Sequence, residues 1–227
     1  MKHISAPHII TVTVDDLKHM YFTSDSHYNH EKVIEYNHRP FNSIEEMNKA
    51  LIDNINNTVS SDDILVHCGD FMLGKCAMYD DYVNSINAKT IYGCIGNHDI
   101  KNIFRKCVLL PYIPNQHIYW GYNILFMVVN EKKKPVFSFT CSHCPYSRDS
   151  FLGIFNIHGH LHTFADMDAY DGRDKELAMD LLEQGIYYDC GVDRNNYKPI
   201  SFIDIVNNRP KIKEKILSQY PNFFDNF

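Results

Sequence analysis

The sequence has no long apolar run, no signal-peptide pattern and no excess of positive charge, and each absence removes a class of protein. None of its apolar stretches approaches the roughly 20 residues that a membrane-spanning helix needs. The first seven residues, MKHISAP, lack the apolar core of a secretory signal, so we expect an intracellular protein that does not bind membranes. The net charge of −6 argues against a broad basic surface, and therefore against long duplex nucleic acid as a partner.

The cysteines do not form a disulfide framework. They number seven, an odd count without tight spacing, which predicts reduced thiols. Cys141 and Cys144 form one C-x-x-C pair with His143 between them, but no second pair completes a zinc ribbon. We interpret these two cysteines as strand and loop residues, with a redox pair as the alternative.

The chain length predicts a single domain over residues 1–227. That many residues can bury a sizeable core, and no repeat, low-complexity tract or linker divides them. The hydrophobic fraction of 44% is ordinary for a globular chain. A charged, Asp-rich stretch at about residues 165–184 is expected to form an excursion from this domain.

Strands and helices alternate in the first half of the chain. Residues 9–14 and 19–23 predict a β-hairpin, and a short helix follows at residues 31–36. Ser43 and Glu46 form a capping box before apolar residues at helical spacing, which predicts a helix that continues to about residue 59. A strand at residues 64–67, a helix at 75–87 and a strand at 91–95 complete this half.

The second half is predicted to be mostly β-structure. Its expected strands cover residues 108–113, 117–120, 123–129, 136–141, 154–157, 186–190 and 200–206. Hairpin turns are expected at residues 121–122 and 131–134, and a terminal helix at residues 211–218.

Polar side chains gather where the predicted strands end, which is where open α/β sheets bind ligands. Five strand ends carry groups that can bind a metal: Asp25 with His27, Asp70, Asn97 with His98, His143, and His160 with His162. In the first and last of these stretches the groups are two residues apart, and on an extended backbone that spacing points both side chains to one face. The sequence therefore predicts a shared metal cluster.

The chemistry of these side chains favours divalent transition ions. Carboxylates with imidazoles are typical ligands of Mn²⁺, Fe²⁺, Ni²⁺ or Zn²⁺ rather than of a thiolate-bound structural zinc. Asp70 is the candidate to bridge two ions, and two ions about 3.5–4 Å apart stabilise both the attacking and the leaving oxygen in phosphoryl displacement. Asp99 is the neighbour of His98 and is close enough to orient its imidazole.

Five short motifs, in this order over about residues 20–165, resemble the signature blocks of the calcineurin-like metallophosphoesterases. They are Asp25-x-His27, Gly69-Asp70, Gly96-Asn97-His98-Asp99, His143 and Gly159-His160-x-His162. The stretches Arg39-Pro40-Phe41 and Gly191-Val192-Asp193…Tyr197-x-Pro199-Ile200 are similar to those of small cap-less members from bacteria and their phages. The resemblance implies a cytoplasmic location in a bacterial cell or a phage-infected host.

The resemblance also implies a fold and a mechanism. The fold is a four-layer α/β/β/α sandwich in which helices flank two mixed β-sheets. One ion would be held by Asp25, His27, Asp70 and His162, and the other by Asp70, Asn97, His143 and His160. A hydroxide between the ions, with Mn²⁺ favoured, would attack phosphorus. His98, outside the ligand set, would protonate the leaving oxygen or stabilise transition-state charge, and Asp99 would orient His98 and keep it cationic.

One departure from the family pattern follows Gly69-Asp70. Protein phosphatases of this superfamily carry an acid and an arginine a few residues after this motif, whereas this chain continues Phe71-Met72-Leu73-Gly74-Lys75. The missing phosphate-binding arginine disfavours a protein phosphatase. Lys75 is better explained as the solvent-facing start of a helix than as its substitute.

Four residues near the motifs are candidate substrate contacts: Asn29, His30, Arg39 and Arg148. The structural alternatives are a helix start for the first two, an ion pair for Arg39 and an exposed loop for Arg148. His67 is expected to be a core histidine, because it alternates with Val66 on a buried strand, and His158 is expected to point away from the site.

These observations lead to the hypothesis of a dinuclear metal-dependent phosphoesterase that hydrolyses phosphodiesters or phosphomonoesters of small or nucleotide-type substrates. Diesters are favoured because His98 can assist a poor alkoxide leaving group. The alternative is a nuclease or a cyclic (oligo)nucleotide phosphodiesterase, and the competitor outside the enzymes is a scaffold of the same fold without catalysis. The oligomeric state stays open and includes a homo-oligomer.

Overall fold

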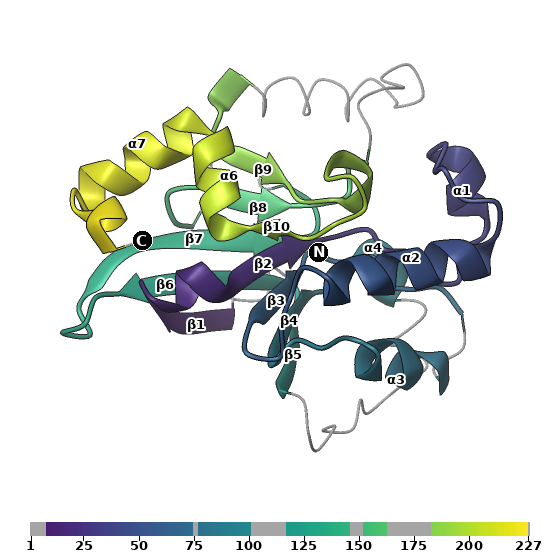
Figure 1. The fold of residues 1–227 in the computed structure, drawn as a ribbon. Coiled ribbons are helices and arrows are strands. Elements are labelled where there is room, and N and C mark those ends of the chain that lie inside the picture. Colours follow the sequence, from purple (N-terminus) through teal and green to yellow (C-terminus); the bar gives the residue numbers. More distant parts are fainter. Residues whose placement is uncertain (1–7, 75–76, 101–116, 146–151, 163–182, 227) are drawn as a thin grey trace, which may run out of the picture.

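Two mixed five-stranded sheets frame the part of the chain that the computed structural model describes, residues 8–74, 77–100, 117–145, 152–162 and 183–226 (Figure 1). The first sheet has the order β1 (His8–Thr13), β6 (Asn123–Val129), β7 (Pro135–Ser142), β8 (Asn156–His158) and β9 (Tyr187–Asp189). The second has the order β10 (Ile200–Ser201), β2 (Met20–Thr23), β3 (Ile64–His67), β4 (Thr90–Cys94) and β5 (His117–Gly121).

Parallel strands bring the carboxyl ends of each sheet to one edge. In the second sheet β2, β3, β4 and β5 are parallel, and only β10 runs against them. In the first sheet β7, β8 and β9 are parallel, while β6 and β7 form an antiparallel hairpin. A parallel bridge between Ser24 and Gly191 joins the end of β2 to the end of β9. The two carboxyl edges therefore meet.

Helices flank the two sheets, and this confirms the predicted α/β/β/α sandwich (Figure 1). They are α1 (Lys32–Tyr36), α2 (Ile44–Asn56), α3 (Ala77–Asn84), α4 (Asn97–Asp99), α6 (Phe202–Asn208) and α7 (Pro210–Gln219), with 3-10 turns η1 (Asp16–His19), η5 (Val192–Arg194) and η6 (Phe223–Asn226). No helix among the described residues is both long and apolar enough to cross a bilayer.

The buried faces of α2 and α3 assign these two helices to one sheet. Leu51 of α2 and Val83 of α3 are buried in one cluster with Leu65 of β3 and Ile91 of β4, so these helices cover the outer face of the second sheet. The predicted start of α2 is confirmed, because Ser43 Oγ accepts a hydrogen bond from the Glu46 backbone N–H at 3.1 Å.

Phe139 of β7 lies at the centre of the other core cluster. Its ring is stacked on Phe155 at a centroid distance of 4.9 Å and on Phe126 at 5.1 Å, and it contacts Phe22 of β2 at 6.2 Å. Phe202 of α6 completes the group at 5.5 Å. Because these rings come from both sheets and from α6, they fix how the two sheets are placed against each other.

Two predicted hairpins are wrong. β1 lies beside β6 in one sheet, whereas β2 lies between β10 and β3 in the other. β5 and β6 also lie in different sheets, although only Tyr122 separates them. A short connection limits the distance between two strand ends but does not oblige the strands to pair. The hairpin around residues 131–134 is confirmed, because β6 and β7 are antiparallel neighbours.

The strand predicted at residues 200–206 is mostly a helix. Only residues 200–201 form β10, and α6 begins at Phe202, where Ser201 Oγ accepts the Asp204 N–H at 3.1 Å. Phe202, Ile205 and Val206 are buried at helical spacing. The strand predicted at residues 108–113 and most of the charged stretch at 165–184 lie outside the described residues.

Removing the central ring should destabilise the fold. Phe139→Ala is expected to lower the free energy of unfolding by about 3–5 kcal/mol, because a fully buried ring leaves a cavity between the sheets. Urea denaturation of metal-free protein measures this change. Tyr122→Ala, at a site that is 50% exposed, is the control and should cost about 0.5 kcal/mol or less. Similar losses for both variants would contradict the role of Phe139.

Candidate metal centre

The structure brings the predicted metal-binding side chains together where the carboxyl edges of the two sheets meet. Asp25 and His27 follow β2, Asp70 follows β3, Asn97 begins α4 after β4, His143 follows β7, and His160 and His162 follow β8. The described residues contain four sets of side chains whose ligand atoms lie within 4.8 Å of one another inside each set: Asp25, His27 and His162; Asp25, Asp70 and His143; His27, Asp70 and His98; and His143, Cys144 and His160.

Five of these residues have a left-handed backbone conformation, which sets the direction of their side chains. Asp25, His27, Asp70, His160 and His162 have φ angles between 49° and 73°, a conformation that costs non-glycine residues of order 1 kcal/mol each. The expectation of an extended backbone in the two paired motifs is therefore wrong. The bend separates the second pair, since His162 joins Asp25 whereas His160 faces His143.

Two glycines leave the space that these side chains occupy. A Cβ atom on Gly159 would lie 2.0 Å from Ser24 Oγ and 2.4 Å from Asp25 Oδ2. Gly69 has a φ of +94°, and a Cβ atom there would lie 2.7 Å from the His143 ring. The glycines in these motifs thus permit close approach between the loops of the two sheets.

Asp70 lies among three imidazoles. Its Oδ2 is 3.3 Å from His143 Nε2, 3.6 Å from His27 Nε2 and 3.9 Å from His98 Nε2. Its Oδ1 accepts the backbone N–H of His98 at 2.9 Å, which fixes the carboxylate. Burial alone would raise the pKa of Asp70, but hydrogen bonding and the charge of His143 lower it. A carboxylate in this central position can serve two neighbouring cations.

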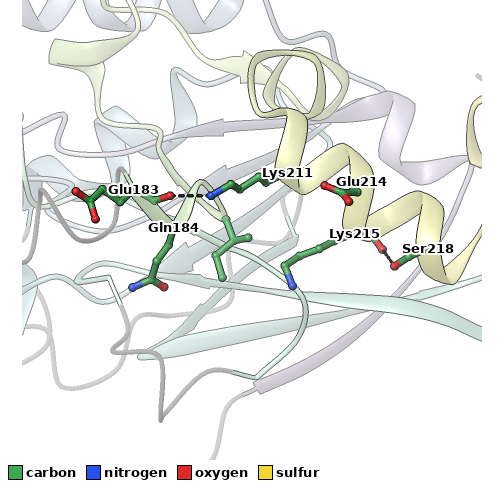
Figure 2. Close-up of a pocket in the computed structure, with 7 residues that line it drawn as sticks. Glu183, Gln184, Lys211, Glu214, Lys215 and Ser218 are labelled. Atoms are coloured by element: carbon green, nitrogen blue, oxygen red, sulfur yellow. Dashed lines mark hydrogen bonds between the residues drawn. The ribbon is translucent and has the colours of Figure 1, made fainter.

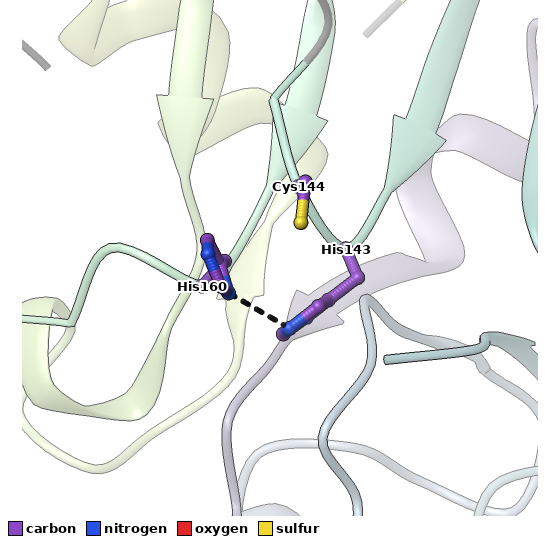
Figure 3. A group of neighbouring side chains, drawn as sticks. All are labelled: His143, Cys144 and His160. Carbon is purple, nitrogen blue, oxygen red and sulfur yellow. Dashed lines mark hydrogen bonds between the residues drawn. The ribbon is translucent and has the colours of Figure 1, made fainter. Parts of the chain in front are cut away.

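His143 Nε2 lies close to three polar atoms, which is more than a single N–H group can hydrogen-bond. Asn97 Oδ1 lies at 2.9 Å, His160 Nδ1 at 3.2 Å and Asp70 Oδ2 at 3.3 Å (Figure 3 shows His143 with His160). The other ring nitrogen, Nδ1, is 3.0 Å from the Cys68 carbonyl oxygen. An N–H at Nδ1 leaves a lone pair on Nε2, so the ring is oriented as a metal ligand would be.

The donor set fits divalent cations. His27 Nε2 is buried without a hydrogen-bond partner among the described residues, which is costly unless a cation lies in front of it. Burial would lower the pKa of His143, yet Asp70 and Asp25 raise it to about 9, so the two buried carboxylates demand positive charge at this point. Imidazole and carboxylate ligands in this mixture suit divalent transition ions.

His162 is held by a carboxylate behind it. Its Nδ1 lies 2.8 Å from Asp193 Oδ2, which places Nε2 as the ring nitrogen that faces the cluster. Asp193 itself is buried and follows β9 at the start of η5. This is the carboxylate–imidazole arrangement by which proteins fix the tautomer of a metal-binding histidine.

The comparison with known families agrees with this geometry. The chain matches the calcineurin-like phosphoesterase family over residues 19–217, which includes every strand that carries a candidate ligand. It belongs to that family.

Two individual proteins are similar to this chain. The uncharacterized protein MJ1445 of Methanocaldococcus jannaschii is 39% identical over 85 residues, which are 37% of this chain and 48% of MJ1445. The chain thus matches about half the length of that curated relative. The crystal structure of AQ665 from Aquifex aeolicus, a protein of unknown function, has a TM-score of 0.56 and 20% identity over 83% of this chain and 98% of AQ665. That likeness shows the shared fold.

The role expected for Asp99 needs correction. Its Oδ1 accepts the Phe71 N–H at 2.8 Å, and its Oδ2 accepts the N–H groups of Asp70 at 2.8 Å and Gly96 at 2.9 Å. The fully buried carboxylate therefore joins the loop after β3 to the loop after β4 instead of orienting the His98 imidazole. Burial and the nearby charge of Asp70 raise the pKa of Asp99 to about 6.

Asp193 belongs to the candidate site but was given no role from the sequence, and Arg39 is its partner. The Arg39 guanidinium forms two 2.8 Å bonds to the Asp193 carboxylate, and both side chains are fully buried. It also donates to the carbonyl oxygens of Asp25 at 2.7 Å and Ser26 at 3.1 Å. The substrate contact predicted for Arg39 is thus replaced by the structural ion pair. The motif around Asp193 was visible in the sequence, but nothing linked it to His162.

The other predicted substrate contacts differ in where they lie relative to the metal cluster. Asn29 Oδ1 accepts hydrogen bonds from Tyr82 at 2.6 Å and from Asn48 at 3.1 Å, so this side chain faces α2 and α3 and not the cluster. The His30 ring lies 5.3 Å from His27 and 5.8 Å from His98, at the partly exposed rim. Arg148 lies outside the described residues.

His67 and His158 are buried. His67 Nε2 lies 2.9 Å from Ser26 Oγ, while burial lowers the pKa of His67 to about 3. His158 Nδ1 lies 2.9 Å from the Gly159 carbonyl oxygen, and burial lowers the pKa of His158 to about 4. Both rings are therefore neutral core groups, as predicted for His67.

A separate cavity of about 630 Å³ lies between the chain before β9 and helix α7 (Figure 2). The described residues that line it are Glu183, Gln184, Ile186, Lys211, Glu214, Lys215 and Ser218. Lys211 Nζ donates to the Glu183 carbonyl oxygen at 2.8 Å. None of these described lining residues belongs to the metal cluster, so we assign the chemistry to the cluster.

His67 should make the folded protein sensitive to acid. The unfolded chain protonates this ring below about pH 6.5, whereas the folded state keeps it neutral down to about pH 3. The unfolded state binds more protons in that window, so stability falls as the pH is lowered, by about 1.4 kcal/mol per unit. Urea denaturation of metal-free protein between these pH values should show a shallower loss for His67→Gln. Equal slopes would contradict this account.

Asp193→Asn should weaken both the fold and the metal site. It leaves the buried Arg39 charge uncompensated, so the free energy of unfolding in chelator should fall by about 3 kcal/mol. It also weakens the support of His162, so metal affinity should fall about 10–100-fold. Denaturation and metal titration measure the two effects separately. Asp62→Asn, at an exposed site, is the matched control, and an Asp193 variant that behaves like it would refute both roles.

Proposed function

We propose that this phosphoesterase hydrolyses small or nucleotide-type phosphoesters with two divalent metal ions, and that it prefers diesters to monoesters. The observation that carries the proposal is the position of Asp70 Oδ2, which is within 3.9 Å of a nitrogen of His27, His98 and His143. A shared carboxylate among imidazoles from both sheets is the donor arrangement that a two-metal centre requires.

The ligands divide into two sets that share Asp70. One set is Asp25, His27, Asp70 and His162, and the other is Asp70, Asn97, His143 and His160. Two divalent ions bound there would supply Lewis acidity and lower the pKa of a water at the site, with Mn²⁺ as the first ion to test. The backbone N–H of His160 holds the Asp25 carboxylate at 3.0 Å, and the backbone N–H of His98 holds that of Asp70.

His98 is the candidate proton donor for the leaving oxygen. Its side chain is 38% exposed, whereas the His27 ring beside it is buried at a centroid distance of 5.0 Å. The imidazole thus lies on the solvent side of the cluster, where a substrate would enter. An alkoxide leaving group gains from such a donor, and this supports the preference for diesters.

Charge supports a small substrate. The chain carries a net charge of −6, and no arginine follows Gly69-Asp70 within five residues. Both features disfavour long duplex nucleic acid and phosphoproteins, whereas a nucleotide, a cyclic nucleotide or a short oligonucleotide needs only local positive charge. These remain the substrate classes to assay.

Leaving-group dependence tests the proposal. The Mn²⁺-loaded protein is assayed on bis-(p-nitrophenyl) phosphate, on p-nitrophenyl phosphate and on a dinucleotide whose leaving group is an alkoxide. His98→Ala should lower kcat on the dinucleotide by about 100-fold or more, but by about tenfold or less on the p-nitrophenyl diester, whose leaving group needs no proton. Metal content should stay unchanged, and His8→Ala, at an exposed position on β1, is the control.

Two results would overturn the proposal. Wild-type protein that binds two metals and hydrolyses none of the esters, including a cyclic dinucleotide, is not a phosphoesterase of this substrate class. Elemental analysis that finds no metal, with no change on Asp70→Asn, would favour a non-catalytic scaffold. An equal loss on both leaving groups would assign His98 to stabilising charge instead of donating a proton.

A further inference from the structure

A thiol lies beside the imidazoles of His143 and His160. Figure 3 shows the Cys144 sulfur turned toward the space between the two rings. Cys144 Sγ and one nitrogen from each ring lie within 4.8 Å of one another, and Cys144 is exposed. These three groups form a donor set of two nitrogens and one sulfur. The ligand sets given above include His143 and His160 but not Cys144.

The backbone around this thiol is fixed. Ser142, a buried residue at the end of β7, donates a hydrogen bond from Oγ to the Cys144 carbonyl oxygen at 2.8 Å. Asn156 Nδ2 of β8 donates to Ser142 Oγ at 3.0 Å and to the Thr140 carbonyl oxygen at 3.0 Å. Two neighbouring strands thus hold the backbone of the turn that carries Cys144.

One pair of nitrogens from these two rings already has the separation of metal ligands. His143 Nε2 and His160 Nδ1 are 3.2 Å apart. Two imidazoles bound to a tetrahedral zinc ion at 2.0–2.1 Å would be separated by about 3.3–3.4 Å. His143 Nδ1 is engaged by the Cys68 carbonyl oxygen, so its Nε2 is the nitrogen available to an ion in this position.

We propose that Cys144 is a ligand of the subsite built on His143 and His160, and that it makes this subsite selective for thiophilic ions such as Zn²⁺ and Cd²⁺ over Mn²⁺. Thiolates bind these soft ions strongly, whereas Mn²⁺ favours oxygen ligands. The thiol proton passes to the buffer when the S–metal bond forms, so binding releases one proton more than it would without Cys144. The inference rests on the proposed function for its use of His143 and His160 as ligands.

The consequence is that the two subsites differ in chemistry. Asp25, His27, Asp70 and His162 offer oxygen and nitrogen only. The subsite with Cys144 adds sulfur at its exposed side, so an ion there is held more tightly when it is thiophilic. A mixed centre, or inhibition by Cd²⁺, follows from this asymmetry.

Absorption spectroscopy of the whole protein tests this without an activity assay. Cd²⁺ and Co²⁺ should give thiolate-to-metal charge-transfer bands in wild-type protein, and Cys144→Ser should abolish them. Loss of this ligand should weaken Zn²⁺ binding by about tenfold or more, because losing even a residue that only hydrogen-bonds a metal ligand costs about tenfold in affinity. The affinity for Mn²⁺ should change less than about twofold. A pH indicator should record one proton fewer released per Zn²⁺. Cys141→Ala, which removes the buried thiol of the same C-x-x-C, should keep the bands.

The outcomes separate this inference from the proposed function. Charge-transfer bands that persist in Cys144→Ser, or equal losses of Zn²⁺ and Mn²⁺ affinity, would overturn it. Wild-type protein that binds Mn²⁺ and hydrolyses diesters but shows no band with Cd²⁺ refutes the role of Cys144 and leaves the phosphoesterase proposal standing. Wild-type protein that binds neither Mn²⁺ nor Cd²⁺ refutes both. Circular dichroism checks that each variant is folded.

Discussion

The burial of two carboxylates, Asp25 and Asp70, is the constraint on which the rest of the site depends. Neither group can lie in the interior without compensating charge and hydrogen bonds. Backbone N–H groups hold both carboxylates, and imidazoles from two sheets surround Asp70. The strained backbone at five candidate ligands and the glycines at their contacts follow from the need to converge on this small volume.

Local patterns predicted the elements of the fold better than their partners. Most strands and helices lie where periodicity and capping place them, and Ser43 begins α2 as expected. The β1–β2 and β5–β6 hairpins failed because strand pairing depends on which sheet can bury each apolar face, and a short connection does not specify that. Residues 200–206 failed because a short apolar run fits either period, and the cap at Ser201 decides for a helix.

In the site, residue types were predictable, but roles set by geometry were not. Among the described residues, the carboxylate and imidazole groups that the structure gathers around Asp70 all belong to the predicted motifs, because ligand chemistry restricts which residues can serve. Asp99 could not be assigned correctly, since adjacency to His98 does not reveal that three backbone N–H groups from two loops converge on it. Asp193 escaped for the same reason, because its partners Arg39 and His162 lie 154 and 31 residues away.

The ion pair between Arg39 and Asp193 also bears on the order in which the parts of the site are synthesised. Arg39 donates a hydrogen bond to the backbone of the loop that carries Asp25, and Asp193 contacts the His162 ring. One ion pair therefore connects the first quarter of the chain to the last. Every candidate ligand precedes Asp193 in the sequence, so each is synthesised before this ion pair can form. The segment after β9 contributes no candidate ligand, but its Asp193 completes the support of both His162 and Arg39, which holds the loop that carries Asp25.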